Sequence, residues 1–257
     1  NQFLIAWVNS AGPFANRDID CRTLRPDGSV SGIVALAATS ADELDVDVGG
    51  DARGLDDECL VVWADASQGI QSNQVTVSAT GDPLPFTPGS VTTTASDRQP
   101  AIAKTMLSTR TLTVWRTSAG AIQGRFLSAN GGPVGTEATI SNSGADDSNP
   151  DVDGDGSVWM AVWQEEEAPN NGFHDIQCRR VLLGASSALS FPEPITALGL
   201  GSQSNDDERD PSVSVHKVRF VVCYEDNSTT TSGNSFAIAA YVGRDACREC
   251  EGRDTVS

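Results

Sequence analysis

The chain has 257 residues, of which 39% are apolar, 35 are acidic and 17 are basic, giving a net charge of −18. This acidity disfavours nucleic-acid binding, because phosphates are repelled and no basic patch with interleaved aromatic residues is present. No run of 18 apolar residues occurs, which argues against a transmembrane segment. The chain begins at Asn1, so we expect a processed or partial product that has lost any export signal.

Short apolar segments that end in an aromatic residue recur along the chain. They are Phe3–Trp7, Leu60–Trp63, Leu112–Trp115, Met160–Trp163 and Phe220–Tyr224. Their terminal aromatics are 56, 52, 48 and 61 residues apart. A period of about 50 residues indicates a repeat architecture.

Three further segments accompany most copies of this apolar segment. The upstream segments are Leu44–Asp47, Pro100–Ala103, Pro150–Asp153 and Pro211–Ser214. An Ile-x-x-Arg pattern follows downstream at Ile19, Ile122 and Ile176, and then a weaker segment at Gly32–Ala38, Ser90–Thr94, Glu137–Asn142 and Pro192–Leu198. A proline fits the first position of a strand, where no ladder hydrogen bond is lost.

Four short strands repeated five times predict an all-β fold, a five-bladed β-propeller with four antiparallel strands per blade. The repeats span about 1–43, 44–97, 98–147, 148–208 and 209–257, within one domain. The chain opens in the second strand of the first repeat, so we expect the two termini to share one blade. The alternative is a larger ring, with residues missing from the ends.

The run Asp151-Val152-Asp153-Gly154-Asp155-Gly156 matches the opening of a calcium-binding loop. An EF-hand is excluded, because the twelfth position is Val162 instead of a glutamate and the flanks are strand-like. We therefore interpret the run first as a hairpin turn. A Ca²⁺ site at Asp151, Asp153 and Asp155 is the second hypothesis, and the sequence indicates no other cofactor.

A polar residue lies two positions beyond each terminal aromatic residue, at Asn9, Asp65, Thr117, Glu165 and Asp226. The loops that lead into the later repeats are acidic as well, at Asp42-Glu43, Asp97, Asp146-Asp147 and Asp206-Asp207-Glu208. In a four-stranded blade these positions share one face, so the pattern predicts an acidic face that binds a cation, a polysaccharide or a basic protein. The alternative interpretation is that strand ends are simply solvated.

The remaining motifs favour structural roles over catalytic ones. Six cysteines suggest at least one disulfide and an exported setting, although buried thiols are the alternative. The repeated arginines are expected to pair with acids of a neighbouring blade. His174 and His216 are too few for a His₃ zinc site, and no nucleophile motif lies beside either.

Written as x-Pro-x-Val, Val-Trp and Asp-Ile-x-x-Arg, the repeat resembles the degenerate propeller repeats of large exported bacterial proteins. The resemblance covers essentially the whole chain but depends on short motifs. The second repeat lacks the proline and the arginine, and Tyr224 replaces the tryptophan in the fifth. Neither the WD signature nor the sialidase Asp box is present. The resemblance implies a secreted, cell-surface or periplasmic binding or scaffolding module.

Two classes of function remain open. The sequence favours a non-catalytic extracellular interaction module that uses the acidic face or the disc rim. The alternative is a five-bladed glycoside hydrolase or a lectin-like carbohydrate-binding propeller. A hydrolase would place two or three carboxylates at the axial pocket, where Asp45, Asp47, Asp151 and Asp153 are the candidates.

Overall fold

The computed structural model describes residues 2–10, 16–49, 58–104, 110–141, 146–166, 172–192, 194–197, 207–216, 219–226, 235–240 and 254–256. The predicted all-β class is confirmed, since the regular secondary structure of the described chain consists of strands apart from one short 3₁₀ turn, η1 (Ala185–Ser187). No helix in this part of the chain is long and apolar enough to cross a membrane.

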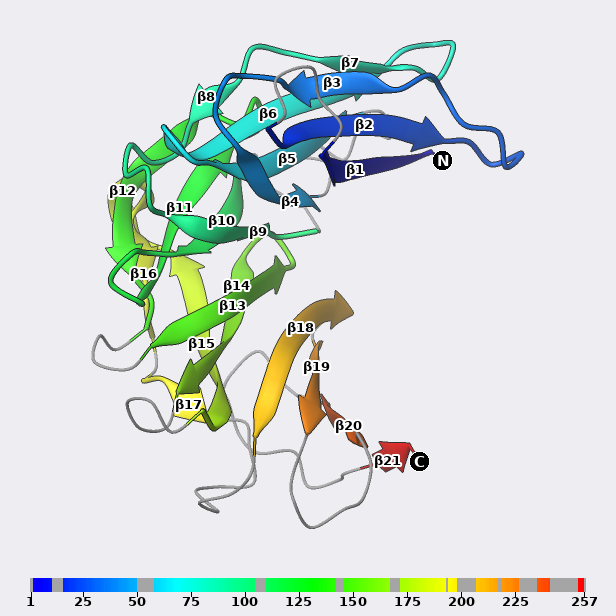
Figure 1. Ribbon diagram of the computed structural model, residues 1–257. Helices are drawn as coiled ribbons and strands as arrows, with labels where there is room; N and C mark the ends of the chain where they lie inside the picture. The colour runs from blue at the N-terminus through cyan, green and yellow to red at the C-terminus, as the bar shows by residue number, and fades with distance from the viewer. Residues whose placement is uncertain are drawn as a thin grey trace.

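The strands form five antiparallel sheets, each built from consecutive segments (Figure 1). The first sheet contains β1 (Phe3–Asn9), β2 (Asp18–Leu24) and β3 (Val34–Ala37). The second contains β4 (Glu43–Gly49), β5 (Glu58–Asp65), β6 (Gly69–Val77), β7 (Pro83–Pro85) and β8 (Gly89–Ser90). The third contains β9 (Arg98–Ile102), β10 (Arg110–Arg116), β11 (Ile122–Ser128) and β12 (Pro133–Thr139).

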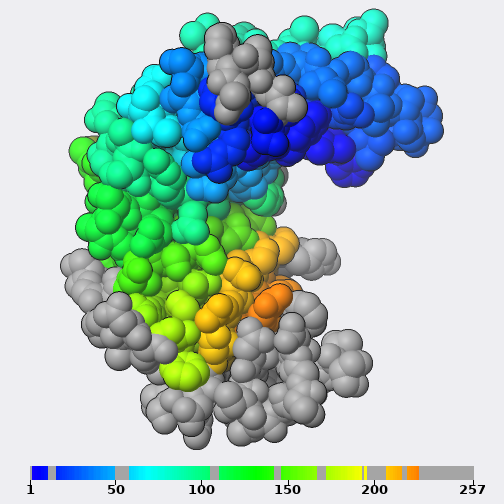
Figure 2. Space-filling model, viewed as in Figure 1, coloured from blue at the N-terminus to red at the C-terminus, as the bar shows by residue number. Residues whose placement is uncertain are grey.

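The last two sheets complete the series. The fourth contains β13 (Asp147–Gly154), β14 (Val158–Glu166), β15 (His174–Leu183), β16 (Leu189–Ser190) and β17 (Thr196–Ala197). The fifth contains β18 (Glu208–His216), β19 (Arg219–Asp226), β20 (Ser235–Ala240) and β21 (Asp254–Val256). The sheets follow one another around an arc that is open between the first and the last (Figures 1 and 2).

The described termini lie in different sheets, β1 in the first and β21 in the last. The expectation that they share one blade is therefore not met in the described residues. The physical reason is that β21 pairs with β20 as the outermost strand of its own sheet, so that no described strand is the inner neighbour of β1.

The hydrophobic core lies between consecutive sheets, in four clusters. The repeated aromatic residues fill these interfaces, because Trp63, Trp115 and Trp163 are each at most 2% exposed. At the interface of the third and fourth sheets, Phe126 meets Trp159 edge-on with ring centroids 4.9 Å apart. Stacked sheets with an apolar layer between each pair explain why the apolar strand recurs in every repeat.

The proline of the upstream segment is not the first residue of its strand, contrary to expectation. β13 begins at Asp147 and β18 at Glu208, three residues before Pro150 and Pro211. Each proline follows a β-bulge, where the pairing of inner strand and second strand shifts register. A proline is tolerated there because a bulge already interrupts the ladder.

Candidate functional site

The bulge residues of the four inner strands have left-handed backbone angles. Asp45, Gln99, Asn149 and Asp210 have φ values of 51°, 52°, 47° and 50°. Such angles are uncommon outside glycine and are best tolerated by Asn and Asp. The same deviation at the same position in four sheets indicates that the bulge is a built feature of the repeat.

A belt of hydrogen bonds joins these residues from sheet to sheet. The Gln99 backbone amide donates to Asp45 Oδ2 (3.1 Å), and its side-chain Nε2 donates to Asn149 Oδ1 (2.6 Å). Asn149 Nδ2 in turn donates to Asp210 Oδ1 (2.7 Å). The bulges therefore turn polar side chains toward the axis of the arc and link them to one another.

An open pocket of about 510 Å³ lies at this axis. Its lining comes from β4, β9, β13 and β18 and from Lys104, two residues after β9. The lining residues are Asp45, Val46, Asp47, Gln99, Pro100, Ala101, Lys104, Asn149, Pro150, Asp151, Asp210, Pro211 and Ser212. Three of the four acids expected at the axis, Asp45, Asp47 and Asp151, line it.

Asp151 is the half-buried carboxylate of this pocket. Its Oδ2 accepts hydrogen bonds from the Val213 backbone amide (2.8 Å) and from Ser212 Oγ (3.1 Å). Burial raises the pKa of Asp151, and the Val213 amide and the Lys104 charge oppose that rise. A carboxyl group with a raised pKa and a fixed orientation is suited to donating a proton.

Asp47 and Lys104 form an ion pair at the pocket wall. Asp47 Oδ2 also accepts a hydrogen bond from the Ile102 backbone amide (2.9 Å), which joins the second sheet to the third. Because of these contacts, the Asp47 carboxylate has a structural role. Asp45 and Asp210 are more exposed and lie on the first and last of the four inner strands.

The three carboxylates of the hypothetical calcium site do not converge. Asp151 faces the axial pocket, whereas Asp153 is buried and accepts hydrogen bonds from the backbone amides of Lys104 (3.0 Å) and Val215 (2.8 Å). Asp155 caps the hairpin turn by accepting from the Ser157 and Val158 amides, both at 2.9 Å. Within the described residues, no group of three or more His, Cys, Asp or Glu is arranged to hold a metal ion.

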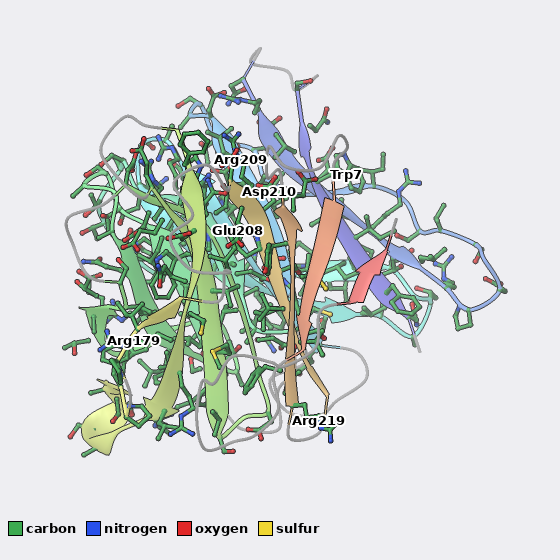
Figure 3. The ribbon with its side chains drawn as sticks, turned by 90° about the horizontal axis from the view of Figure 1, so that it is seen from below. Trp7, Arg179, Glu208, Arg209, Asp210 and Arg219 are labelled. Atoms are coloured by element: carbon green, nitrogen blue, oxygen red, sulfur yellow. The ribbon has the colours of Figure 1, made fainter. Side chains whose placement is uncertain are left out.

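The acids expected to form a solvated face are largely interior. Strand register places Glu43 opposite Asp65, Asp147 opposite Glu165 and Glu208 opposite Asp226. Each pair lies at the end of its sheet where the inner strand begins. In the fifth sheet Glu208 lies at this end and Arg219 at the other (Figure 3).

Burial makes this end unsuitable as an exposed acidic surface. Glu43, Asp65, Asp147 and Glu208 are each at most 2% exposed. Asp65 caps its own turn by accepting from the Ser67 amide (2.7 Å). Burial raises the pKa of Asp147 to about 7.

The remaining positions of that set are likewise engaged locally. Asn9 Nδ2 donates to Asp20 Oδ2 (2.7 Å), and the Thr117 hydroxyl accepts from the Ala121 amide (3.1 Å). Glu165 is half-buried and accepts from Gln177 Nε2 (2.8 Å). For Asp226 only the strand position is described.

The repeated arginines join sheets by donating to backbone carbonyls. Arg125 Nη1 donates to Val91 O (3.2 Å), and Arg179 Nη1 donates to Ile140 O (2.6 Å), each in the preceding sheet. Arg179 also stacks over Phe191 at 4.0 Å. The expected pairing with acids is therefore replaced by carbonyl contacts, and neither arginine lines the axial pocket.

No disulfide forms among the described cysteines. Cys21, Cys59, Cys178 and Cys223 lie on four different sheets, and Cys247 and Cys250 lie outside the described residues. Burial raises the pKa of the Cys21 thiol to about 12, so this residue behaves as a small apolar side chain.

Sequence reasoning missed Gln99, Asn149, Asp210 and Lys104 at the pocket. The first three share one signal, a polar residue directly before the proline of the inner strand. Asp45 occupies the same place before Val46. Lys104 had no repeat signal, because the equivalent positions in β13 and β18 are Gly154 and Val215.

No protein-family model and no curated protein matches the chain. Solved structures match it by fold. The intramolecular trans-sialidase from Ruminococcus gnavus is 11% identical with a TM-score of 0.56 over 84% of this chain and 47% of that one. The endo-arabinase from Bacteroides thetaiotaomicron is 13% identical with a TM-score of 0.50, over 94% of this chain and 90% of that one.

The NanB sialidase from Streptococcus pneumoniae is 12% identical with a TM-score of 0.50, over 84% of this chain and 33% of that one. The chain therefore spans about half or less of the length of the two sialidases. At these identities the likeness shows the fold, which is of the β-propeller type.

These neighbours correct one expectation from the sequence. The non-catalytic interaction module that the sequence favoured is contradicted, because the matching solved structures described above are a trans-sialidase, an endo-arabinase and a sialidase. Burial of Glu43, Asp65, Asp147 and Glu208 also reduces the number of carboxylates available at the presumed acidic face. The alternative hypothesis, a propeller that acts on carbohydrate, is the better supported one.

Proposed function

We propose that the chain is a five-bladed, glycoside-hydrolase-like propeller whose active site is the axial pocket. One observation carries the proposal. An open pocket of about 510 Å³ on this fold holds Asp45 and Asp151 on separate inner strands, and burial raises the pKa of Asp151. Paired carboxyl groups in different environments are the machinery of glycoside hydrolysis.

Asp151 takes the role of general acid. Burial raises its pKa and so favours the protonated form of the carboxyl group, and the Val213 amide and Ser212 hydroxyl hold its orientation. In the reaction its proton passes to the departing glycosidic oxygen as the bond to the anomeric carbon breaks.

Asp45 takes the role of the second carboxylate. It is exposed at the pocket wall and accepts one hydrogen bond, from the Gln99 amide. A water molecule adds to the anomeric carbon and gives up a proton, either to Asp45 as base or, after a covalent intermediate on Asp45, to Asp151. Asp47 and Lys104, which form an ion pair, belong to the pocket wall that also holds Asp45 and Asp151.

A neutral sugar fits the pocket better than an anionic one. Asp45, Asp47, Asp151 and Asp210 face a single cation, Lys104, and no arginine is among the lining residues. A sialoside carries a carboxylate that this lining repels, whereas arabinan is uncharged. Arabinan-type polysaccharides are therefore the substrate class we infer, and secretion or surface exposure is the setting that suits such a substrate.

The test is turnover by the purified chain. Neutral 4-nitrophenyl glycosides, arabino-oligosaccharides and a sialoside are compared, with product release as the readout. We expect hydrolysis of a neutral arabinoside, and Asp151→Asn should lower kcat by about 10²–10⁴-fold on substrates whose leaving group needs a proton.

A second active-site variant and one control variant make the result specific. Asp45→Asn should abolish turnover, whereas Asp155→Asn, in the hairpin turn, should leave it unchanged. Saturable binding of arabino-oligosaccharide without turnover would assign the same pocket to a lectin-like carbohydrate-binding propeller. Absence of both turnover and binding would contradict the proposal.

A further inference from the structure

The inner edge of the first sheet is unpaired within the described chain. β1 pairs with β2, and no second partner of β1 occurs among the described strands. In each of the other four sheets the equivalent edge carries an inner strand, namely β4, β9, β13 or β18. The first sheet therefore lacks one strand that its sister sheets have.

Ile5 lies on the face of β1 that points away from the second sheet, because its neighbours Leu4 and Ala6 pack toward that sheet. Its exposure therefore reflects both the missing inner strand and the open end of the arc. Ile5 is 41% exposed, and Phe3 on the same strand is 63% exposed. The residues equivalent to Ile5 in three other sheets are buried: Val61 at 0%, Ala161 at 0% and Val222 at 2%.

Each buried equivalent stands opposite an inner-strand valine. The cross-strand pairs are Val61 with Val48, Ala161 with Val152 and Val222 with Val213. Directly opposed residues of an antiparallel pair lie side by side on one face, so the valine covers one side of its partner, while the preceding sheet covers the rest of that face.

The unpaired edge of β1 lies next to the row of contacting inner strands. The inner strands contact one another in the order β4, β9, β13 and β18. Carboxylates of these strands accept hydrogen bonds from backbone amides of the next inner strand. The Ile102 amide donates to Asp47 (2.9 Å), and the Val213 amide donates to Asp151 (2.8 Å). β1 contacts β4, so a strand added to β1 would extend this row of inner strands by one member.

We propose that β1 binds an extended peptide strand of the form acid-x-x-Pro-x-Val, supplied by a polypeptide outside residues 1–257. Two inner strands have this form, from Asp147 and from Glu208. In this register the valine covers Ile5, the proline follows the bulge and the acid lies opposite Asn9. Main-chain hydrogen bonds supply affinity, and the valine at Ile5 supplies selectivity. The site is independent of the proposed hydrolase activity.

The experiment uses the full chain and a synthetic peptide with the sequence of residues 208–215, capped at both ends. Fluorescence anisotropy of the labelled peptide measures binding, and hydrogen exchange measures protection of the β1 amides. We expect saturable one-to-one binding and slower exchange in β1 when the peptide is present. A scrambled peptide of the same composition should not bind.

Ile5→Ser should weaken binding about tenfold, the equivalent of one partly buried apolar contact. Its matched control is Val30→Ser, which changes an equally exposed apolar residue away from the edge and should leave binding unchanged. Absence of saturable binding would overturn the proposal. So would β1 amides already protected in the peptide-free monomer, which would show that the chain covers its own edge. Protection that develops with self-association would assign the edge to a second copy and would equally overturn it.

Discussion

Asp147 on β13 lies directly opposite Glu165 on β14, so two carboxyl groups share one end of the fourth sheet. Asp147 is fully buried, and neither of its oxygens has a partner at normal hydrogen-bond distance, although Ser141 and Trp163 are near enough to lower its pKa in part. Burial prevails and raises the pKa to about 7, with the Glu165 charge adding to the rise.

This pKa makes the fold more stable in mild acid. The raised native pKa of Asp147 lies above the unfolded value of about 3.9. Its contribution to stability is therefore complete below about pH 4 and is lost as the pH rises through about 7. Burial raises the pKa of Glu43, Asp97 and Glu165 in the same direction. We expect the melting temperature to fall between about pH 4 and pH 7, measured by calorimetry.

Asp147→Asn should flatten that profile, because an amide does not ionise. At about pH 8 the variant should melt several degrees above the parent chain, at roughly 2–4 °C per kcal/mol for a protein of this size. Asp82→Asn is the control, since Asp82 is an exposed carboxylate paired with Arg25 at 3.3 Å. A profile as steep in Asp147→Asn as in the parent would show that Asp147 is not the titrating group.

Asp153 joins three sheets through one carboxylate. Oδ1 accepts from the Lys104 amide and Oδ2 from the Val215 amide, at 3.0 and 2.8 Å. Asp153→Ala leaves both amides without this acceptor, and we expect a loss of about 2–4 kcal/mol of unfolding free energy. Asp153→Asn keeps one oxygen and should lose less. Urea unfolding measures both, and equal stability of Asp153→Ala and parent would refute the bridging role.

The repeat was predictable from sequence because each sheet needs an apolar strand to pack against its neighbour. Trp63, Trp115 and Trp163 fill the same place between sheets, so their spacing reported the architecture directly. The presence of acids at the axis followed from the same alignment, since Asp45, Asp47 and Asp151 lie on the inner strands.

The roles of the acids were not predictable in this way. Solvated and buried carboxylates look alike in a sequence, so Glu43 and Asp147 were expected at the surface although both are buried. Gln99 and Asn149 reach the pocket through left-handed bulges, a backbone feature that the neighbouring proline only hints at. Lys104 meets Asp47 across two sheets, a contact without any local pattern.

Gly69 and Gly28 provide a matched pair for testing the close packing between β6 and the segment after β8. Both have φ of +82°, so an added Cβ costs each about 1 kcal/mol of backbone strain. A Cβ on Gly28 meets nothing within 4 Å, whereas on Gly69 it lies 2.6 Å from both Thr92 Oγ1 and the backbone oxygen of Thr94.

We therefore expect Gly28→Ala to lose about 1 kcal/mol of unfolding free energy and Gly69→Ala to lose at least about 2–3 kcal/mol, since overpacking adds to strain. Urea unfolding of both variants gives the comparison. The difference between them isolates the steric contact, because the backbone strain is shared. Equal losses would mean that the Thr92–Thr94 segment moves aside freely, and the close packing at this turn would then contribute nothing to stability.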